Sequence, residues 1–361
     1  MHDPFPIPCP PLLAQLAKPL ATALDLPTLP LHVHEILFAT LTYHLICVYL
    51  SPFVSTRLFP TIYPKLPSRT RLNWDVHVVS LVQSVAICSL ALWVMRVDGE
   101  RKTQEWEERV FGYTGAGGMI QGFAAGYFLW DLVICIRHLA VFGWGLLAHA
   151  VAALVVFSLG FRPFVNFYGP NFILYELSSP FLNFHWFFDK VNMTGSRPQW
   201  YNGIFLLTSF FSCRLVWGSY QSVRVYADVW SALHIDNAGV LEKAWDVGDE
   251  VMQYATGANV PAWLGGVYLG SNVVLNTLNF YWFGKMIETI RKRFSERKGK
   301  ENGNLKEEDP VLVEGVALVD GVVDGVVLYE DEDVKETGYI QVDEEERVLK
   351  LHKTEVRKRK G

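Results

Sequence analysis

The sequence has few cysteines and lacks most of the patterns that mark metal, phosphate and nucleic-acid sites. Its five cysteines have neither metal-ligand spacing nor the spacing of a disulfide framework, so we expect buried thiols. The glycine-rich stretch at residues 115–118 contains neither GxGxxG nor a lysine-bearing phosphate loop. No large basic patch is interleaved with aromatic residues, which argues against nucleic-acid binding. We therefore expect no metal, no resident cofactor and no nucleic-acid partner.

Long apolar runs are what the sequence does have. Half of its 361 residues are hydrophobic and 14% are aromatic, although the C-terminal tail is strongly charged. Residues 76–94 and 141–161 approach the roughly 20 residues that a helix needs to cross a bilayer. The sequence predicts an all-α, multi-pass transmembrane bundle of about seven spans. Prolines at residues 163–188 leave six or eight spans as alternatives.

The chain divides into four parts by composition. Residues 1–33 are rich in proline, and an amphipathic helix on the membrane surface is predicted at 12–26. Residues 34–67 hold the first span and a basic linker. Residues 68–288 form the main apolar domain, and residues 289–361 are charged. The expected spans are 34–49, 73–95, 119–137, 141–159, 163–188, 204–225 and 262–286. The expected connections include 55–71, 96–109, a glycine turn at 113–118, 189–200 and an acidic loop at 227–257.

The distribution of basic residues predicts the orientation in the membrane. The linker at 55–71 contains lysine and arginine with almost no acids, and a dense basic cluster follows the last span. Both features are typical of cytoplasmic segments, so we expect a cytosolic C-terminus that can contact anionic lipid headgroups. For residues 301–361 the composition predicts disorder. The cluster consists of Arg291, Lys292, Arg293, Arg297, Lys298 and Lys300.

The most informative polar stretch is YELSSPFLN at residues 175–183, inside a very apolar region. An ionised carboxylate in hydrocarbon costs about 2.5–3.5 kcal/mol on insertion scales, so Glu176 should face a protein-lined cavity. Ser179 lies on the same helical face, and Asn183 follows the break that Pro180 introduces.

Other spans carry isolated polar residues that we expect to face the same interior. Asp131 lies within the third span and shares a face with Tyr127 and His138, and His149 is the ionisable residue of the fourth span. Arg214 is a plausible partner for Asp131 or Glu176. Hydrogen bonds that merely join helices are the alternative interpretation for each of them. Two further sets share a helical face, namely His77, Ser80 and Ser84 beside Gln83, and Asn272, Asn276 and Asn279.

Several of these segments, in this order, resemble the TLC domain. They are YFLWD at 127–131, the pair Ala148-His149, ELSSPFLN at 176–183 followed by WFF at 186–188, and residues 275–282 with Asn279. The resemblance covers about residues 68–288, and the family includes ceramide synthases, translocon-associated membrane proteins and other TLC-domain-containing proteins. It implies a protein of the endoplasmic reticulum or a related endomembrane, with a helical bundle around a lipid-sized cavity.

The resemblance implies a role in lipid synthesis, sensing, transport or homeostasis. In ceramide synthases a paired-histidine motif is tied to acyl transfer, whereas Ala148 replaces one histidine here, and Gln83 stands where family members often carry histidine. We therefore expect a protein that binds, senses or moves membrane lipid. The alternative is an acyl-CoA-dependent sphingoid-base N-acyltransferase, with His149 as general base, Asp131 or Glu176 as its orienting group, and acyl-CoA as co-substrate. A transporter or channel is disfavoured, because we find no internal repeat.

Overall fold

The computed structural model describes residues 1–234, 250–255 and 260–301, and within those ranges all regular secondary structure is helical. The predicted all-α class is therefore confirmed. Four helical stretches are long and apolar enough to cross a membrane, which indicates an integral membrane protein. They are Leu29–Leu58, Ser68–Val97, Gly115–Arg137 and Leu139–Leu159. The charged tail from 302 onward, where we predict disorder, lies outside the described residues.

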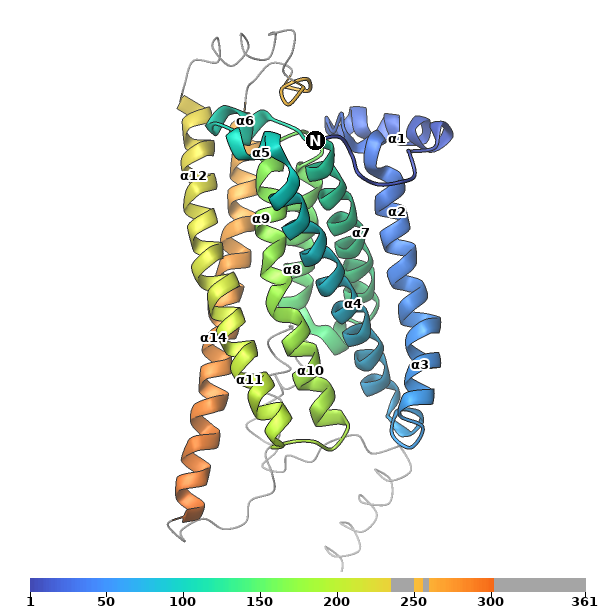
Figure 1. Ribbon diagram of the computed structural model, residues 1–361, viewed down its shortest axis with the longest axis vertical. Helices are drawn as coiled ribbons and strands as arrows, with labels where there is room; N and C mark the ends of the chain where they lie inside the picture. The colour runs from blue at the N-terminus through green and yellow to red at the C-terminus, as the bar shows by residue number, and fades with distance from the viewer. Residues whose placement is uncertain (235–249, 256–259, 302–361) are drawn as a thin grey trace, which may run out of the picture. The chain divides into compact units, whose positions relative to one another are not determined.

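The first long stretch combines three elements: α2 (Leu29–Leu45), a π-helical turn (Ile46–Leu50) and α3 (Ser51–Leu58). The helix does not end near residue 49, where we expected the first span to close ahead of Ser51 and Pro52, but continues to Leu58. A proline removes one helical donor, and the wider π turn just before it lets the chain continue as helix. The expected helix in the proline-rich segment is present as α1 (Pro11–Leu24), which lies crosswise at the end of α2 (Figure 1).

The segment between the second and third long helices is more helical than expected. After α4 (Ser68–Val97) come α5 (Gly99–Thr103) and α6 (Trp106–Phe111), where we predicted an irregular loop. Both short helices are capped, α5 by the Asp98 side chain and α6 by a capping box of Glu105 and Glu108.

The expected glycine turn at 113–118 was also wrong, because Gly115 begins α7 (Gly115–Arg137). Thr114 caps this helix by accepting a hydrogen bond from the amide of Gly117 at 3.2 Å. The glycines in the first turn of α7 allow neighbouring side chains to come close. A Cβ on Gly117, for example, would lie 2.5 Å from Asn166 Oδ1. The fourth expected span is α8 (Leu139–Leu159), which is kinked at Gly143, where φ is +72°.

The interruption that prolines predict near Glu176 is present. The path runs through a 3₁₀ turn (Asn166–Tyr168), α9 (Gly169–Ile173), a second 3₁₀ turn (Leu174–Ser178) and α10 (Ser179–Lys190). Pro180 lies in the first turn of α10, where the missing amide hydrogen leaves no helical bond unmade.

The next helical path is longer than the predicted sixth span. It comprises α11 (Arg197–Phe210), a π-helical stretch (Phe211–Trp217) and α12 (Gly218–His234). We expected an acidic loop from residue 227, but the helix continues to His234 and Asp228 is a buried residue within it. Residues 235–249 and 256–259 of the expected loop lie outside the described part. The last helix is α14 (Ala262–Glu301).

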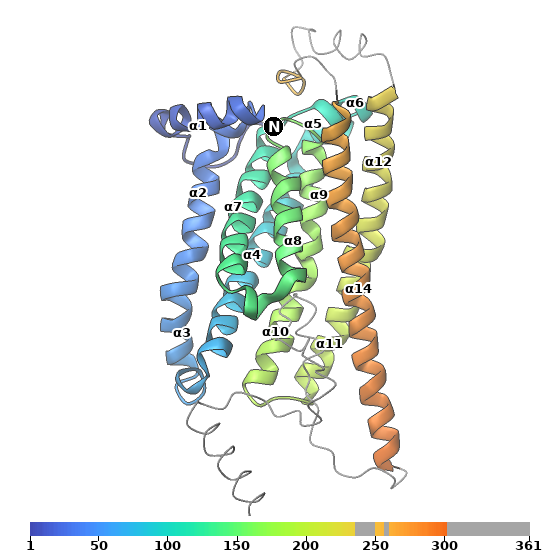
Figure 2. The ribbon, with the colours of Figure 1, turned by 180° about the vertical axis from the view of Figure 1, so that it is seen from behind.

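Helix α7 is the most enclosed of the four long apolar helices and packs against α2, α4, α8 and α9. Gly118, Gly122 and Gly126 recur every four residues and let α2 come close, since a Cβ on Gly126 would lie 2.5 Å from the Ile36 carbonyl oxygen. Figures 1 and 2 show α2 and α3 along one edge of the bundle and α12 and α14 along the other. The interior polar residues lie between these edges.

Candidate functional site

Arg214 and Glu176 form a buried ion pair within the bundle, with 3.6 Å between Nη2 and Oε1. Only 4% of Arg214 and 7% of Glu176 is exposed, so both charges have left water. A pair of this kind is tolerated only when additional hydrogen bonds satisfy both groups. Of the two partners expected for Arg214, the structure shows this pairing with Glu176.

The hydrogen bonds around this pair come from the interrupted helix and from α14. Arg214 Nε donates to the Tyr175 carbonyl oxygen at 3.0 Å and to Ser178 Oγ at 3.1 Å. Its Nη2 donates to Ser179 Oγ at 3.1 Å, and its Nη1 donates to Asn279 Oδ1 at 3.3 Å. Ser179 Oγ in turn donates to Glu176 Oε2 at 2.8 Å.

Irregular helix geometry places both partners. Glu176 lies in the 3₁₀ turn ahead of Pro180, and Arg214 lies in the π-helical stretch between α11 and α12. A π stretch widens the helix locally and is frequent at functional sites. The 3₁₀ turn and the π-helical stretch therefore pack directly against each other, and the ion pair lies between them.

A second polar group joins α4 to α10. His77 Nδ1 and Asn183 Oδ1 are 2.6 Å apart, and Asn183 Nδ2 donates to Ser80 Oγ at 3.0 Å. The His77 ring also stacks on Trp186, with 4.3 Å between ring centroids. The polar stripe expected on the second span therefore does face another helix.

These two groups border a cavity of about 40 Å³. Its walls bring together Asp131, His149 and Glu176, as the sequence predicts, and a cavity of this size holds about three water molecules. The lining also includes Tyr127 and the ring of Trp282, whose centroid is 5.5 Å from that of His149. The polar lining residues are His77, Ser80, Tyr127, Asp131, His149, Glu176 and Arg214.

A second cavity, of about 30 Å³, adjoins the first and has mainly apolar walls. His149 and Glu176 line both cavities, so they stand at the boundary between a polar and an apolar space. Neither cavity has the size of a lipid, in contrast to the lipid-sized cavity that the resemblance implied. The other residues around the second cavity are Phe128, Ala153, Val156, Phe157, Phe172, Ile173, Tyr175, Asn272 and Leu275.

The three asparagines of α14 do point the same way. Asn272 lines the second cavity, Asn279 binds Arg214, and Asn276 donates to Ser222 Oγ of α12 at 2.9 Å. Asn276 therefore joins α14 to α12 and lines neither of the two cavities described.

The part of the chain that contains these cavities also matches a known protein family. The family model of the TLC domain matches residues 73–288. This chain belongs to the TLC domain family. A TLC domain-containing protein of Schizosaccharomyces pombe, itself uncharacterized, is 38% identical over 282 residues, which cover 78% of this chain and 86% of that protein.

Two further relatives show how widely the family extends. Topoisomerase I damage affected protein 4 of Saccharomyces cerevisiae is 30% identical, across 72% of this chain and 85% of its own length. Human TLC domain-containing protein 4 is 28% identical, across 48% of this chain and 65% of its own length. These relatives show what the chain is similar to, and their names assign it no reaction.

The TLC domain places the candidate residues at different distances from the cavities. Asp131, His149, Glu176 and Asn272 line a cavity, whereas Ser179, Asn183 and Asn279 hold lining residues through hydrogen bonds. Whether any of them contacts lipid stays a prediction. His138, expected to share the face of Asp131, instead lies at the junction of α7 and α8 and is not among the lining residues.

The pair Ala148-His149 has an informative geometry. His149 lines both cavities, while Ala148 is exposed on the outer face of α8. Successive residues of an α-helix point about 100° apart, since one turn takes 3.6 residues. A histidine at position 148 would therefore face away from the cavities of this TLC domain in its present conformation.

His77 and Trp282 are among the lining residues that the expected site did not include. His77 belongs to a polar stripe that the sequence does reveal, but its spacing alone does not tell a cavity from a helix interface. Trp282 gave no signal, because an aromatic residue in a span more often packs against lipid or core.

An ion pair at one end of the TLC domain joins the short helix α6 to α12. Arg109 of α6 donates to both carboxylate oxygens of Asp228 in α12, at 2.7 and 2.8 Å, and Tyr168 donates to the same carboxylate at 2.5 Å. Hydrogen bonding to Asp228 raises the pKa of Arg109 above its usual value. Burial lowers the pKa of Arg101 to about 10, which still leaves it charged at neutral pH.

Proposed function

We propose that this TLC domain protein binds a membrane lipid inside its bundle and, by binding, sensing or moving that lipid, contributes to membrane lipid homeostasis. The observation that carries the proposal is the contact between the polar cavity and the apolar cavity at His149 and Glu176. An amphiphile presents the same contrast, with a polar headgroup next to a hydrocarbon chain. Family membership supports the same conclusion.

Binding of a whole lipid requires the two cavities to open. Ligand pockets usually measure about 300–1,000 Å³, several times the volumes of about 40 and 30 Å³ found here. Trp282 is the side chain best placed to move, because it is large, lines the polar cavity and lies against His149 of α8. We infer that lipid enters where α8 and α14 pack together.

We also propose that the protein resides in the endoplasmic reticulum or a related endomembrane, spans it about seven times and has a cytosolic C-terminus. Three helical paths beyond the four long apolar helices support this count, namely 166–190, 197–234 and 262–301. The basic cluster after the last expected span supports the orientation. Fluorescence microscopy of tagged protein and accessibility of a C-terminal tag in semi-permeabilised cells test both points. A tag protected from cytosolic protease contradicts the proposed orientation.

The proposed lipid function is tested by comparing the lipidome with protein abundance. Cells expressing Glu176→Gln or His149→Ala in place of the wild-type chain should show an altered lipid class at normal protein abundance. His44→Ala, which changes an exposed histidine of α2, is the matched control and should leave lipids unchanged. If the variants merely lower protein abundance while lipid levels stay normal, the polar residues only join helices, and the proposal fails.

An acyl-CoA-dependent N-acyltransferase is the second candidate, and one observation favours it. His149, Asp131 and Glu176 line one cavity, so a base and a carboxylate face the same space. His149 would accept the proton of the sphingoid amine as the amine attacks the acyl thioester, and CoA would leave as the thiol. Purified protein supplied with acyl-CoA and sphingoid base should then release free CoA, and His149→Ala should abolish the release. Absence of turnover over a broad acyl-chain panel counts against this candidate.

A further inference from the structure

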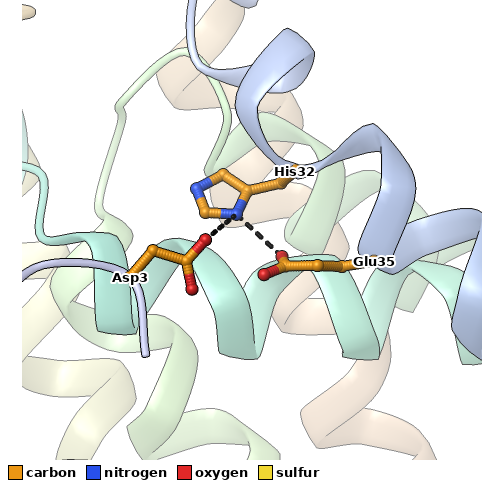
Figure 3. A group of neighbouring side chains, drawn as sticks. All are labelled: Asp3, His32 and Glu35. Carbon is orange, nitrogen blue, oxygen red and sulfur yellow. Dashed lines mark hydrogen bonds and ion pairs between the residues drawn. The ribbon is translucent and has the colours of Figure 1, made fainter. Parts of the chain in front are cut away.

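A cluster of three titratable side chains lies apart from the cavity residues, where the N-terminal segment meets α2. Figure 3 shows the carboxylates of Asp3 and Glu35 both reaching the same nitrogen of the His32 ring. His32 Nδ1 is 2.7 Å from Glu35 Oε2 and 3.8 Å from Asp3 Oδ2. One ligand atom from each residue lies within 4.8 Å of the other two. The three atoms are therefore close enough for one metal ion to reach all of them once the hydrogen bond between His32 and Glu35 opens.

Burial makes this arrangement costly when both carboxylates are ionised and no cation lies between them. His32 and Glu35 are 0% exposed, and Glu35 Oε1 has no hydrogen-bond partner among the residues that the structure describes. An unsatisfied buried carboxylate oxygen is rare, because its lost hydration is not replaced. A positive ion between the two carboxylates would replace it.

Two glycines of α7 make room for the side chains of His32 and Glu35 on α2. His32 and Glu35 are three residues apart on α2, so they lie on one face of the helix. Gly122 of α7 lies under Glu35, where a Cβ would be 2.5 Å from Oε2, and a Cβ on Gly118 would clash with His32 Nε2. Asp3 is the more accessible residue, with 31% of its side chain exposed, and it gives an ion a route from solvent.

Tyr113 supplies the outer contact that histidine ligands usually have. Its hydroxyl is 2.6 Å from His32 Nε2, on the side of the ring away from the carboxylates. In the present contacts a proton on Nδ1 is shared with Glu35. With an ion on Nδ1, the neutral ring would carry its proton on Nε2 and donate it to the Tyr113 oxygen. No net proton needs to leave the histidine.

We propose that Asp3, His32 and Glu35 bind a divalent transition-metal ion, with Zn²⁺ as the best match. One imidazole nitrogen and two carboxylate oxygens are ligands that Zn²⁺ accepts, and three protein ligands leave a position for water. This site replaces the expectation, drawn from sequence spacing, that the chain holds no metal. The bound ion would tie the N-terminal segment to α2.

The test measures Zn²⁺ binding to the full chain, purified without a polyhistidine tag and stripped of metal by a chelator. Titration against a Zn²⁺ indicator should give one tight site per chain. Glu35→Gln and Asp3→Asn should each weaken that site by at least about tenfold, since each removes a charged ligand. Asp25→Asn and His44→Gln are matched controls, because both alter exposed residues of the same region, and they should bind as the wild type does.

A second readout separates binding from folding. Co²⁺ in place of Zn²⁺ should give a visible absorption band that the Asp3→Asn variant loses, and circular dichroism of that variant should match the wild type, because Asp3 is partly exposed. Zn²⁺ affinity that is equal in the wild type, the two ligand variants and the controls overturns the proposal. So does a stripped wild-type chain that takes up no Zn²⁺.

Discussion

Arg214 contacts five polar atoms from three helical segments, so a single side chain joins the 3₁₀ turn, α10 and α14. Its guanidinium compensates the buried carboxylate of Glu176, and its other nitrogens bind oxygens that the 3₁₀ turn and α14 supply. Removing the positive charge would leave Glu176 buried without compensation.

Arg214→Met should therefore lower the free energy of unfolding by about 3–5 kcal/mol, the usual effect of breaking a buried ion pair. Glu176→Gln should cost less, because the amide still accepts from Ser179 and Arg214. Thermal unfolding in detergent, followed by intrinsic tryptophan fluorescence, measures both. Equal costs, adding fully in the double variant, would show that the two residues are not coupled.

The residue scale also shows what sequence reasoning can select. Glu176 and Asp131 were selected because charge is expensive in an apolar run, and His149 as the ionisable residue of its span. The structure places all three around one cavity, and their role as a functional site stays a prediction. Asp3, His32 and Glu35 were missed because 28 residues of chain separate the first two, and their spacing matches no common metal motif. Only the approach of the N-terminal segment to α2 brings them together.

At the scale of elements, the close contact between α2 and α7 depends on residues without side chains. A Cβ on Gly126 would lie 2.5 Å from the carbonyl oxygen of Ile36, which is backbone and cannot move aside cheaply. Gly270 of α14, by contrast, has no heavy atom within 4 Å of the place where a Cβ would be.

These two glycines form a matched pair for experiment. Gly126→Ala should destabilise the protein, since the added methyl group separates α2 from α7. Gly270→Ala should be neutral or stabilise it by up to about 1 kcal/mol, the gain in helix propensity. The shift in melting temperature of the two variants in detergent measures the difference. A Gly126→Ala variant as stable as Gly270→Ala would contradict the close packing of α2 on α7.

The pairing of α6 with α12 is the second element contact that can be tested. Arg109→Gln should loosen α6 by removing both hydrogen bonds to Asp228 and leaving that carboxylate to Tyr168 alone. Because the pKa of Arg109 is higher in the folded than in the unfolded chain, its contribution to stability is fully present below the unfolded-state pKa and is lost as pH rises from there through the folded-state pKa. The protection of the α6 amides, taken as the intrinsic exchange rate at each pH divided by the observed rate, should be lower in the variant and should stay constant in the wild type between pH 6 and about 9. Equal exchange in both chains would mean that the pair does not hold α6.

The element boundaries show what local sequence rules leave open. Pro52 and the glycines at 115–118 are ordinary signals for the end of a helix, yet both lie in helix here. A π turn accommodates the proline, and the Thr114 cap together with tight packing accommodates the glycines. Both compensations depend on neighbouring segments, so local composition alone does not reveal them.

On the scale of the whole molecule, the all-α class followed from hydropathy, and the TLC family followed from the order of the motifs. The size of the interior did not, because cavity volume depends on how side chains from five or more segments meet. The proposal that lipid occupies this interior therefore rests on the polar cavity lying next to the apolar one, and it requires both cavities to widen.

Two alanines of α8 allow that central claim to be tested directly. Ala153 lines the apolar cavity and is 2% exposed, whereas Ala148 is exposed on the outer face of the same helix. Native mass spectrometry of the intact protein released from lipid nanodiscs should find one lipid class bound to the wild type and to Ala148→Leu. The same lipid should be lost from Ala153→Leu, because the larger side chain fills the apolar cavity. Identical lipid on all three proteins, or a wild-type chain that is lipid-free, would contradict the account.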